Sequence, residues 1–151
     1  MKLLITGIPG TGKTSIGNYF QSENGYEHLD IEAVLKKYGH AGSKIVDEFI
    51  NKQGDKKVIT WGFIPKTDDR LVRKLQSLGY KMIWFDGNRE AARREFLIRG
   101  DVPEELFDLQ ISKINDMDLE SFKAVQFNTF DEYGNFLEKE DIVKSIFENC
   151  N

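Results

Sequence analysis

The sequence predicts an α/β fold in which a parallel sheet of five strands is flanked by helices. Five short runs rich in leucine, β-branched and aromatic residues alternate along the chain with segments of helical periodicity. This alternation predicts a parallel sheet, because a parallel crossover needs a connection about as long as a helix. The 151 residues suit a single domain, which we expect to span positions 1–151.

The expected strands are short, and two of them end at a glycine. They cover residues 2–6, 26–29, 58–61, 80–85 and 124–129. The first strand runs from Lys2 into a turn at Gly7. The third, from Val58 to Trp61, consists only of β-branched and aromatic residues and breaks at Gly62.

Helical patterns occupy the intervals between the strands. Six of them cover residues 14–21, 31–38, 43–52, 88–98, 104–114 and 139–148. A seventh begins at an N-cap, Thr67 or Asp68, and stops at Gly79. Its expected apolar stripe consists of Leu71, Leu75 and Leu78.

Composition and charge limit the classes of partner. The 21 Lys and Arg residues against 25 Asp and Glu residues leave a formal charge of -4, so nothing in the composition favours binding to nucleic acid or to an anionic membrane. The apolar opening, Leu3 to Ile5, is too short for a signal-peptide core or a membrane span. The single cysteine, Cys150, fits a reducing compartment. We therefore expect a cytoplasmic protein without membrane contact.

The loop after the first strand has the pattern of a P-loop. It consists of Gly7, Ile8, Pro9, Gly10, Thr11, Gly12, Lys13 and Thr14, followed by Ser15. The glycines let backbone N–H groups approach phosphate oxygens, and Lys13 at a helix start can bridge the β- and γ-phosphates. The Thr14 hydroxyl is suited to bind Mg²⁺. We expect this loop, with Ser15, to bind ATP with Mg²⁺; the alternative is an ordinary turn between a strand and a helix.

Other polar and glycine residues also fall at the ends of expected strands. They are Asp30, Trp61 with Gly62, and Asp86. In open α/β sheets, ligands bind outside the carboxyl ends of the strands. We therefore expect these residues to share one crevice with the P-loop.

The loop, the short second strand ending in Asp30 and the chain length resemble the small P-loop kinases, a superfamily that includes adenylate, shikimate and gluconate kinases. The resemblance implies a three-layer P-loop NTPase fold with a short lid over residues 100–115. Residues 25–32 are similar to a shikimate-kinase stretch ending in two carboxylates spaced by one residue. It implies that Asp30 reaches the metal through water and that Glu32, here in place of an aspartate, orients or deprotonates the acceptor hydroxyl. The alternative is that Asp30 caps a helix with Glu32 in its first turn.

The turn from Trp61 to Thr67 is similar to an adenylate-kinase turn whose arginine binds the phosphate of the acceptor. Trp61 replaces an acidic residue of that turn, and Lys66 replaces the arginine. The resemblance assigns Trp61, Gly62 and Lys66 to the acceptor. The triple-glycine acceptor loop of shikimate kinases is missing from the sequence, so we expect neither a strict adenylate kinase nor a strict shikimate kinase.

Two arginines precede the expected lid. By resemblance, Arg94 and Arg99 stack on adenine or clamp the transferring phosphate. They lie five positions apart, about 140° around a helix, so at most one of them points at the nucleotide. The alternative is that Arg94 and Arg99 pair with Glu90 and Glu95, each pair being worth about 0.2–0.5 kcal/mol.

The lid segment contains no paired cysteines or histidines, which excludes a zinc-bound lid. Its helix has Pro103 in the first turn, with Asp101 or Val102 expected near the cap. Residues 129–134, after the last strand, lie where these kinases often hold adenine.

The sequence supports two functions. The first is a kinase that transfers the γ-phosphoryl group of Mg-ATP to a small-molecule or nucleotide acceptor, with Lys13, Asp30, Glu32 and Arg99 as catalytic residues. The second is a nucleotide-binding or slowly NTP-hydrolysing protein without an acceptor. Trp61 favours the second, because an acidic residue at that position often completes magnesium coordination.

Overall fold

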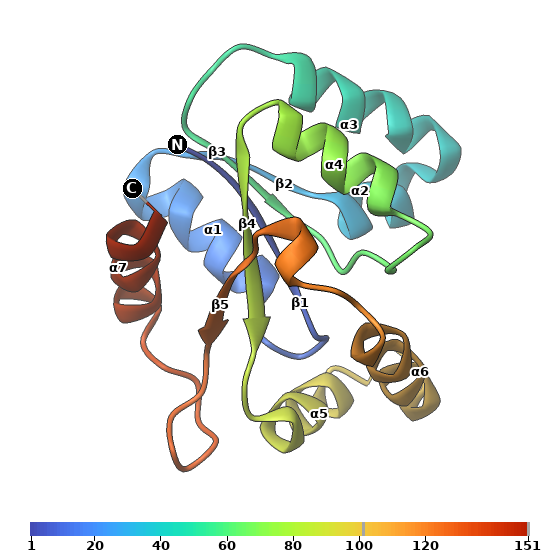
Figure 1. Ribbon diagram of the computed structural model, residues 1–151, viewed down its shortest axis with the longest axis vertical. Helices are drawn as coiled ribbons and strands as arrows, with labels where there is room; N and C mark the ends of the chain where they lie inside the picture. Colours follow the sequence, from blue (N-terminus) through green and yellow to red (C-terminus); the bar gives the residue numbers. More distant parts are fainter. Residues whose placement is uncertain (101, 151) are drawn as a thin grey trace.

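Five parallel strands form one sheet in the order β2-β3-β1-β4-β5. The computed structural model describes residues 1–100 and 102–150 (Figure 1). The strands are β1 (Lys2–Gly7), β2 (Glu27–Asp30), β3 (Lys57–Thr60), β4 (Tyr80–Asp86) and β5 (Val125–Asn128). All five lie within two residues of their expected positions, which confirms the predicted parallel sheet.

Helices connect the strands. They are α1 (Lys13–Asn24), α2 (Ile31–Tyr38), α3 (Gly42–Asn51), α4 (Asp69–Ser77), α5 (Arg89–Ile98), α6 (Glu104–Asn115) and α7 (Lys139–Cys150), with short 3-10 helices η1 (Gly39–Ala41) and η2 (Glu120–Phe122). Helices α1 and α7 lie on one side of the sheet, and the other helices lie on the opposite side (Figure 1). In the described part of the chain, no helix is long and apolar enough to cross a membrane.

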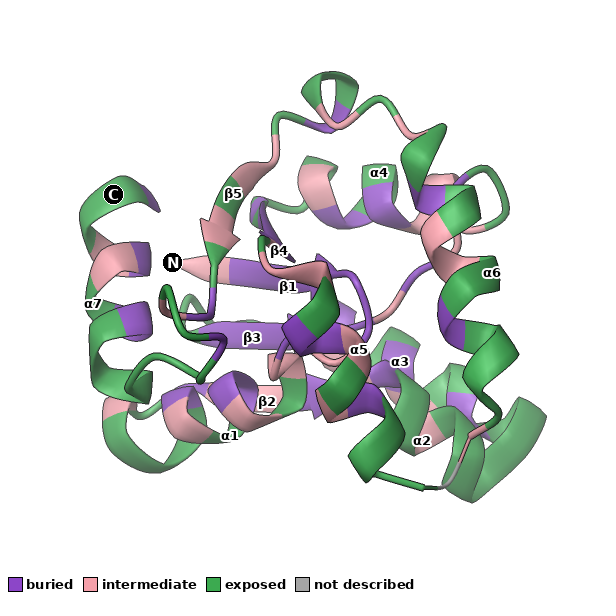
Figure 2. Ribbon diagram, turned by 90° about the horizontal axis from the view of Figure 1, so that it is seen from below, coloured by how far each residue is buried: buried purple, intermediate pink, exposed green. Residues whose placement is uncertain are grey.

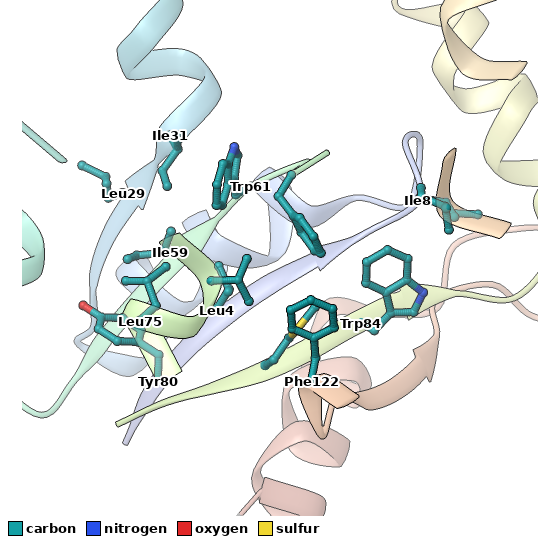
Figure 3. Close-up of a cluster of buried hydrophobic side chains, with 14 of the residues drawn as sticks. Leu4, Ile8, Leu29, Ile31, Ile59, Trp61, Leu75, Tyr80, Trp84 and Phe122 are labelled. Carbon is teal, nitrogen blue, oxygen red and sulfur yellow. The ribbon is translucent and has the colours of Figure 1, made fainter. Parts of the chain in front are cut away.

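Alternation along β1 divides the core into two clusters, because successive side chains of a strand point to opposite faces. Leu3 and Ile5 pack with α1 and α7, whereas Leu4 joins the cluster on the side of α4. Figure 3 shows the second cluster, with Leu4 beside Ile59. Buried strands therefore lie between two helical layers whose outer surfaces are exposed (Figure 2).

The register aligns the carboxyl ends of the strands at one edge. Leu4 of β1 is paired with Ile59 of β3 and Met82 of β4. The central strand β1 therefore runs into its loop between the ends of β3 and β4. This placement puts the P-loop beside the segments that follow the neighbouring strands.

Two local predictions were wrong. Leu78 was assigned to the apolar stripe of α4, but that helix ends at Ser77 and buries Val72 and Leu75, so Leu78 turns outward and is 38% exposed. The third strand was expected to begin at Val58, but Lys57 begins β3 and is fully buried. Its ammonium group donates to the backbone carbonyls of Phe49, at 2.7 Å, and Lys52 at the end of α3, which satisfies the buried charge.

Helix caps follow the predicted chemistry in part. The Asp30 and Asn88 side chains cap α2 and α5, and Asp68 is the N-cap residue of α4. The N-cap residue of α6 is Pro103 rather than Val102, and Asp101 lies outside the described residues.

Candidate functional site

The P-loop is a tight connection between β1 and α1 that needs glycine at two positions. Gly7 has φ 132° and Gly10 has φ 78°, a region that favours glycine. A Cβ atom on Gly7 would stand 2.0 Å from the Phe85 carbonyl oxygen, and one on Gly10 would stand 1.9 Å from the Ala92 carbonyl oxygen. The loop therefore packs directly against the backbone of β4 and α5, which holds its shape.

A hollow of about 740 Å³, which we call the P-loop hollow, opens above this connection. Its lining includes ten residues expected from the sequence: Pro9, Gly10, Gly12, Lys13, Thr14, Ser15, Asp30, Glu32, Gly62 and Arg99. The side chains of Ile8 and Thr11 are buried beneath the loop, where the Thr11 hydroxyl donates to the Ile8 carbonyl at 2.8 Å. N–H groups in the first turn of α1 have no partner inside the helix, so this end of α1 suits an anion.

Lys13 folds back onto the P-loop. Its ammonium group donates to the carbonyl oxygens of Ile8 at 2.8 Å and Gly7 at 3.3 Å. Burial lowers the pKa of Lys13 to about 8, with Glu32 and Asp30 opposing that shift and Arg99 adding to it. A bound phosphate would replace the two carbonyl oxygens as the partner of Lys13, and its negative charge would favour the protonated form of the Lys13 amine.

Thr14 and Asp30 place two oxygen atoms side by side. The Thr14 hydroxyl donates to one carboxylate oxygen of Asp30 at 2.6 Å, and the other carboxylate oxygen accepts from the Ala33 N–H at 2.9 Å. Asp30 is therefore a helix cap and also faces the P-loop, so the two interpretations of this residue are compatible.

The donor set fits magnesium bound through a nucleotide. Hydroxyl and carboxylate oxygens are the ligands that Mg²⁺ prefers, and it usually keeps several waters. No group of three or more histidine, cysteine or acidic residues able to hold a metal occurs among residues 1–100 and 102–150. A magnesium ion at Thr14 and Asp30 would thus need phosphate oxygens and waters for its remaining positions.

Glu32 and Gly62 meet at one side of the P-loop hollow. A Cβ atom on Gly62 would stand 2.6 Å from a carboxylate oxygen of Glu32. The carboxylate therefore lies against the backbone that follows β3, and any larger residue at position 62 would displace it. The expected convergence of these two strand ends is present in the structure.

The two arginines expected near the nucleotide, Arg94 in α5 and Arg99 just after it, have different environments. Arg99 lines the P-loop hollow, with its guanidinium carbon 5.8 Å from the centre of the Phe96 ring. Arg94 does not line this hollow; it donates to the Gly134 carbonyl and lies 3.5 Å from Glu95. The role of either arginine toward a nucleotide stays a prediction, but their separation around the helix agrees with the expectation that at most one faces the hollow.

The expected lid consists mainly of α6, which is attached to α5. Arg93 forms ion pairs with Glu104 and, at 3.4 Å, with Asp108. The rings of Phe96 and Phe107 lie 5.5 Å apart. The face of α6 toward the P-loop contributes Leu106 and Gln110 to the hollow.

Trp61 and Lys66 lie away from the P-loop hollow. Trp61, 8% exposed, lines a second hollow of about 700 Å³ between α2, α3 and α4, which we call the Trp61 pocket. Lys66 is exposed with φ 68° and lines neither hollow, so its contact with an acceptor stays a prediction.

Asp86 was expected in the shared crevice, and this prediction was wrong. Its carboxylate instead receives hydrogen bonds from Arg89 at 3.2 and 3.1 Å and from the Gly87 N–H at 2.9 Å. Burial alone would raise the pKa of Asp86, but these bonds and one from Trp84 outweigh it and lower the pKa. Asp86 therefore joins the end of β4 to the start of α5.

Several lining residues were not predicted. They are Ala33, Lys36, Glu95, Phe96, Val102, Leu106, Gln110 and Phe136. Phe136 stacks on Phe130, with ring centres 4.6 Å apart, and its ring edge stands 3.2 Å from where a Cβ atom of Gly12 would lie. It follows closely on residues 129–134, the segment expected to hold adenine, so that segment was the available signal.

Comparisons with known proteins agree on the fold. No family model matches the chain. A segment of 35 residues is 49% identical to "Adenylate kinase isoenzyme 6 homolog" of Dictyostelium discoideum, a match covering 23% of this chain and only 20% of that protein. The structure is similar to a sugar kinase from Janibacter sp. HTCC2649, with a TM-score of 0.68 and 15% identity over 97% of this chain and 92% of the other.

Two further solved structures resemble the chain over nearly its whole length. A shikimate kinase from Bacteroides thetaiotaomicron has a TM-score of 0.63 and 17% identity, covering 98% of this chain and 96% of its own. A gluconokinase from Sinorhizobium meliloti 1021 has a TM-score of 0.60 and 14% identity, covering 99% and 97%. The chain therefore has the P-loop kinase fold that these enzymes share.

Proposed function

We propose that the protein is a kinase that transfers the γ-phosphoryl group of Mg-ATP to a hydroxyl group of a small acceptor. The observation that carries this proposal is that Lys13, the Thr14–Asp30 pair, Glu32 and Arg99 all line one hollow. A site that only held a nucleotide would need Lys13, Thr14 and Asp30. Glu32 and Arg99 add a carboxylate and a cation to the same hollow.

Each residue has a role that its position supports. Lys13 and the amide groups of the loop bind phosphate oxygens, and the Thr14 hydroxyl and the Asp30 carboxylate hold Mg²⁺, which neutralises charge on the transferring group when bound. Glu32 accepts the proton of the acceptor hydroxyl, and Arg99 stabilises the negative charge of the phosphoryl oxygens. Phosphoryl transfer depends mainly on positioning and electrostatics, and this set would supply both.

A second candidate is a nucleotide-binding or slowly NTP-hydrolysing protein. Trp61 favours it, because this largely buried indole stands where adenylate kinases carry an acidic residue and offers magnesium no oxygen. Such a protein would consume ATP at a rate that no acceptor changes.

The two candidates differ in how ATP consumption responds to acceptors. We would measure ADP release with Mg²⁺ and a panel of hydroxyl compounds, using Lys13→Ala as the inactive control. A kinase should show a rise of at least tenfold with one member of the panel, and no rise in the variant. A slow rate that every acceptor leaves unchanged would favour the second candidate.

A further inference from the structure

The Trp61 pocket has an apolar floor and a polar rim. Buried side chains of Ile31, Val46 and Trp61 form the floor, and Leu71 and the exposed Leu35 extend it toward solvent. The five come from α2, α3, the end of β3 and α4, so the pocket is enclosed on several sides. Its volume of about 700 Å³ falls in the range of small-molecule sites.

Three of the polar side chains around this pocket bind other protein groups. Asp47 and Lys74 pair across the rim at 3.4 Å, and Asp68 accepts from the Ile64 N–H at 2.7 Å. Ser43, Thr67 and Arg70 also line the pocket, but all three are exposed at the rim. The buried part of the pocket therefore offers a ligand few hydrogen-bonding groups.

Trp61 supplies one such group. No hydrogen bond of its indole N–H to another described residue is found, and the nitrogen is not among the fully buried polar atoms. Figure 3 shows the nitrogen at the end of the ring that points away from Leu4. By contrast, the fully buried Trp84 indole donates to Asp86 at 3.3 Å. Trp61 can therefore offer a ligand a flat apolar face and one donor.

The Trp61 pocket and the P-loop hollow are lined by consecutive residues at two places in the chain. Ile31 and Trp61 line the pocket, while the next residue in each case, Glu32 or Gly62, lines the P-loop hollow. Consecutive Cα atoms are about 3.8 Å apart, so the backbone of Ile31–Glu32 and of Trp61–Gly62 forms the boundary between the two hollows.

We propose that the acceptor is an aromatic alcohol: a flat, largely apolar ring with one short hydroxyl-bearing arm. The ring lies in the Trp61 pocket and the arm reaches Glu32. This inference rests on the proposed kinase function. A polyol or sugar acid would instead bury several hydroxyl groups against Ile31, Val46 and Trp61, where each unpaired group costs about 1–3 kcal/mol.

The transfer step follows from this placement. The hydroxyl oxygen of the acceptor forms a bond to the γ-phosphorus, and its proton passes to Glu32. At the same time, the bond between that phosphorus and the bridging oxygen breaks, and ADP leaves with the electron pair. The products are the phosphate ester of the alcohol and ADP.

The test compares two classes of acceptor by turnover and by direct binding. The aromatic probes are benzyl alcohol, 4-methylbenzyl alcohol and 2-phenylethanol, and the polyol probes are gluconate, shikimate and glycerol. ADP release reports turnover, and isothermal titration calorimetry with Mg²⁺ and a non-hydrolysable ATP analogue reports binding. We expect at least one aromatic probe to bind and to raise ADP release, and the polyol probes to do neither.

Two surface variants on α2 locate the binding site. Leu35, 41% exposed, lines the Trp61 pocket, whereas Tyr38, 46% exposed and one turn away, does not. Neither side chain belongs to the buried core, so both variants should fold. Leu35→Gln should weaken binding of the aromatic probe roughly tenfold and leave the KM for ATP unchanged, because an apolar contact becomes polar. Tyr38→Gln should leave both unchanged.

The outcomes separate this inference from the proposed function. Phosphorylation of gluconate, shikimate or glycerol, without any aromatic probe, would overturn the inference and leave the kinase function standing. If no probe raises ADP release, the calorimetry decides. Binding of an aromatic probe that Leu35→Gln weakens would still support the ligand class, and absence of aromatic binding to a protein that binds the ATP analogue would overturn it. Equal effects of the two variants would also count against the Trp61 pocket.

Discussion

The imidazole of His28 lies directly against the backbone of Gly17. A Cβ atom on Gly17 would stand 2.3 Å from Nε2 of His28. The same ring nitrogen is 2.9 Å from the Thr60 hydroxyl, and Nδ1 is 3.0 Å from the amide oxygen of Asn18. Burial lowers the pKa of His28, with Asp30 opposing that shift, which fits a neutral ring between a donor and an acceptor. The contact fixes the distance between α1 and β2.

We expect Gly17→Ala to disturb, from a distance, the magnesium site that we propose at Thr14 and Asp30. The added methyl group meets the His28 ring, so we expect α1 to shift away from β2; these two elements carry Thr14 and Asp30, whose oxygens are 2.6 Å apart. Overpacking of this kind costs about 1–3 kcal/mol. The variant should unfold at a lower temperature, and its turnover should need more Mg²⁺ for half-saturation.

A matched glycine provides the control. Gly42 also lies in a helix without a positive φ, and its added Cβ atom would stand 3.1 Å from the Val34 carbonyl oxygen, a much milder contact. Gly42→Ala should therefore leave the Mg²⁺ dependence unchanged. Adding His28→Ala to Gly17→Ala should recover part of the lost stability; strictly additive losses would show that the imidazole is not what the methyl group meets.

Two substitutions distinguish the role of Asp30 as a helix cap from its proposed role as a metal ligand. Asp30→Asn keeps an oxygen for the Ala33 N–H but loses the charge, whereas Asp30→Ala loses both. We expect the asparagine variant to keep nearly all of its stability and to lose turnover more than ATP affinity, because the metal contact matters most as charge develops. The alanine variant should lose about 1 kcal/mol of stability as well. Thermal unfolding and a magnesium titration measure the two effects, and an asparagine variant with full turnover would leave Asp30 only as a cap.

Lys13 should make ATP binding depend on pH. Because burial lowers its pKa to about 8 in the free protein, the amine is protonated below that pH and increasingly neutral above it. Between pH 8 and 10.5 the unfolded chain keeps a proton that the folded protein has lost, so this group makes folding more favourable as the pH rises through that window. Phosphate binding needs the charged form, so ATP affinity should fall above pH 8 by up to about tenfold per pH unit.

The variant Lys13→Arg is the control for that titration, because arginine stays charged throughout. Its ATP affinity, measured by calorimetry from pH 7 to 9.5, should be lower than that of the wild type and nearly independent of pH. A wild-type affinity that does not change over this range would show that the Lys13 amine is not the group that binds phosphate.

The parts of the site that sequence could predict are those set by local spacing. Gly7 to Thr14 form one strand, loop and helix, so their order alone brings the lysine and the threonine to one helix end. Asp30 and Gly62 follow parallel strands, and parallel strands end at one edge. Both inferences depend on neighbours in sequence or on the general geometry of the fold.

The parts that failed depend on contacts between distant segments. Lys57 stands in a charged run that favours a turn, and only the carbonyl groups at the end of α3 explain its burial. Helical spacing predicted that at most one of Arg94 and Arg99 faces the nucleotide. It could not predict the partner of Arg94, because the Gly134 carbonyl that holds this side chain comes from a distant turn. The same turn brings Phe136 to the P-loop, and the only signal for that residue was its nearness to residues 129–134, the segment expected to hold adenine.

Lys66 distinguishes a neutral acceptor from an anionic one. It is exposed, has φ 68° and lines neither hollow, while its backbone N–H donates to Asp69 at 2.8 Å. For an aromatic alcohol without charge, Lys66→Gly should leave the KM of the acceptor and the KM of ATP unchanged. The glycine also removes the cost of a left-handed lysine, about 1 kcal/mol, partly offset by the greater freedom of the unfolded chain. Steady-state kinetics and thermal unfolding on the two proteins measure both effects. A selective rise in the KM of the acceptor would instead mean that the acceptor carries negative charge and that the turn containing Lys66 reaches it during catalysis.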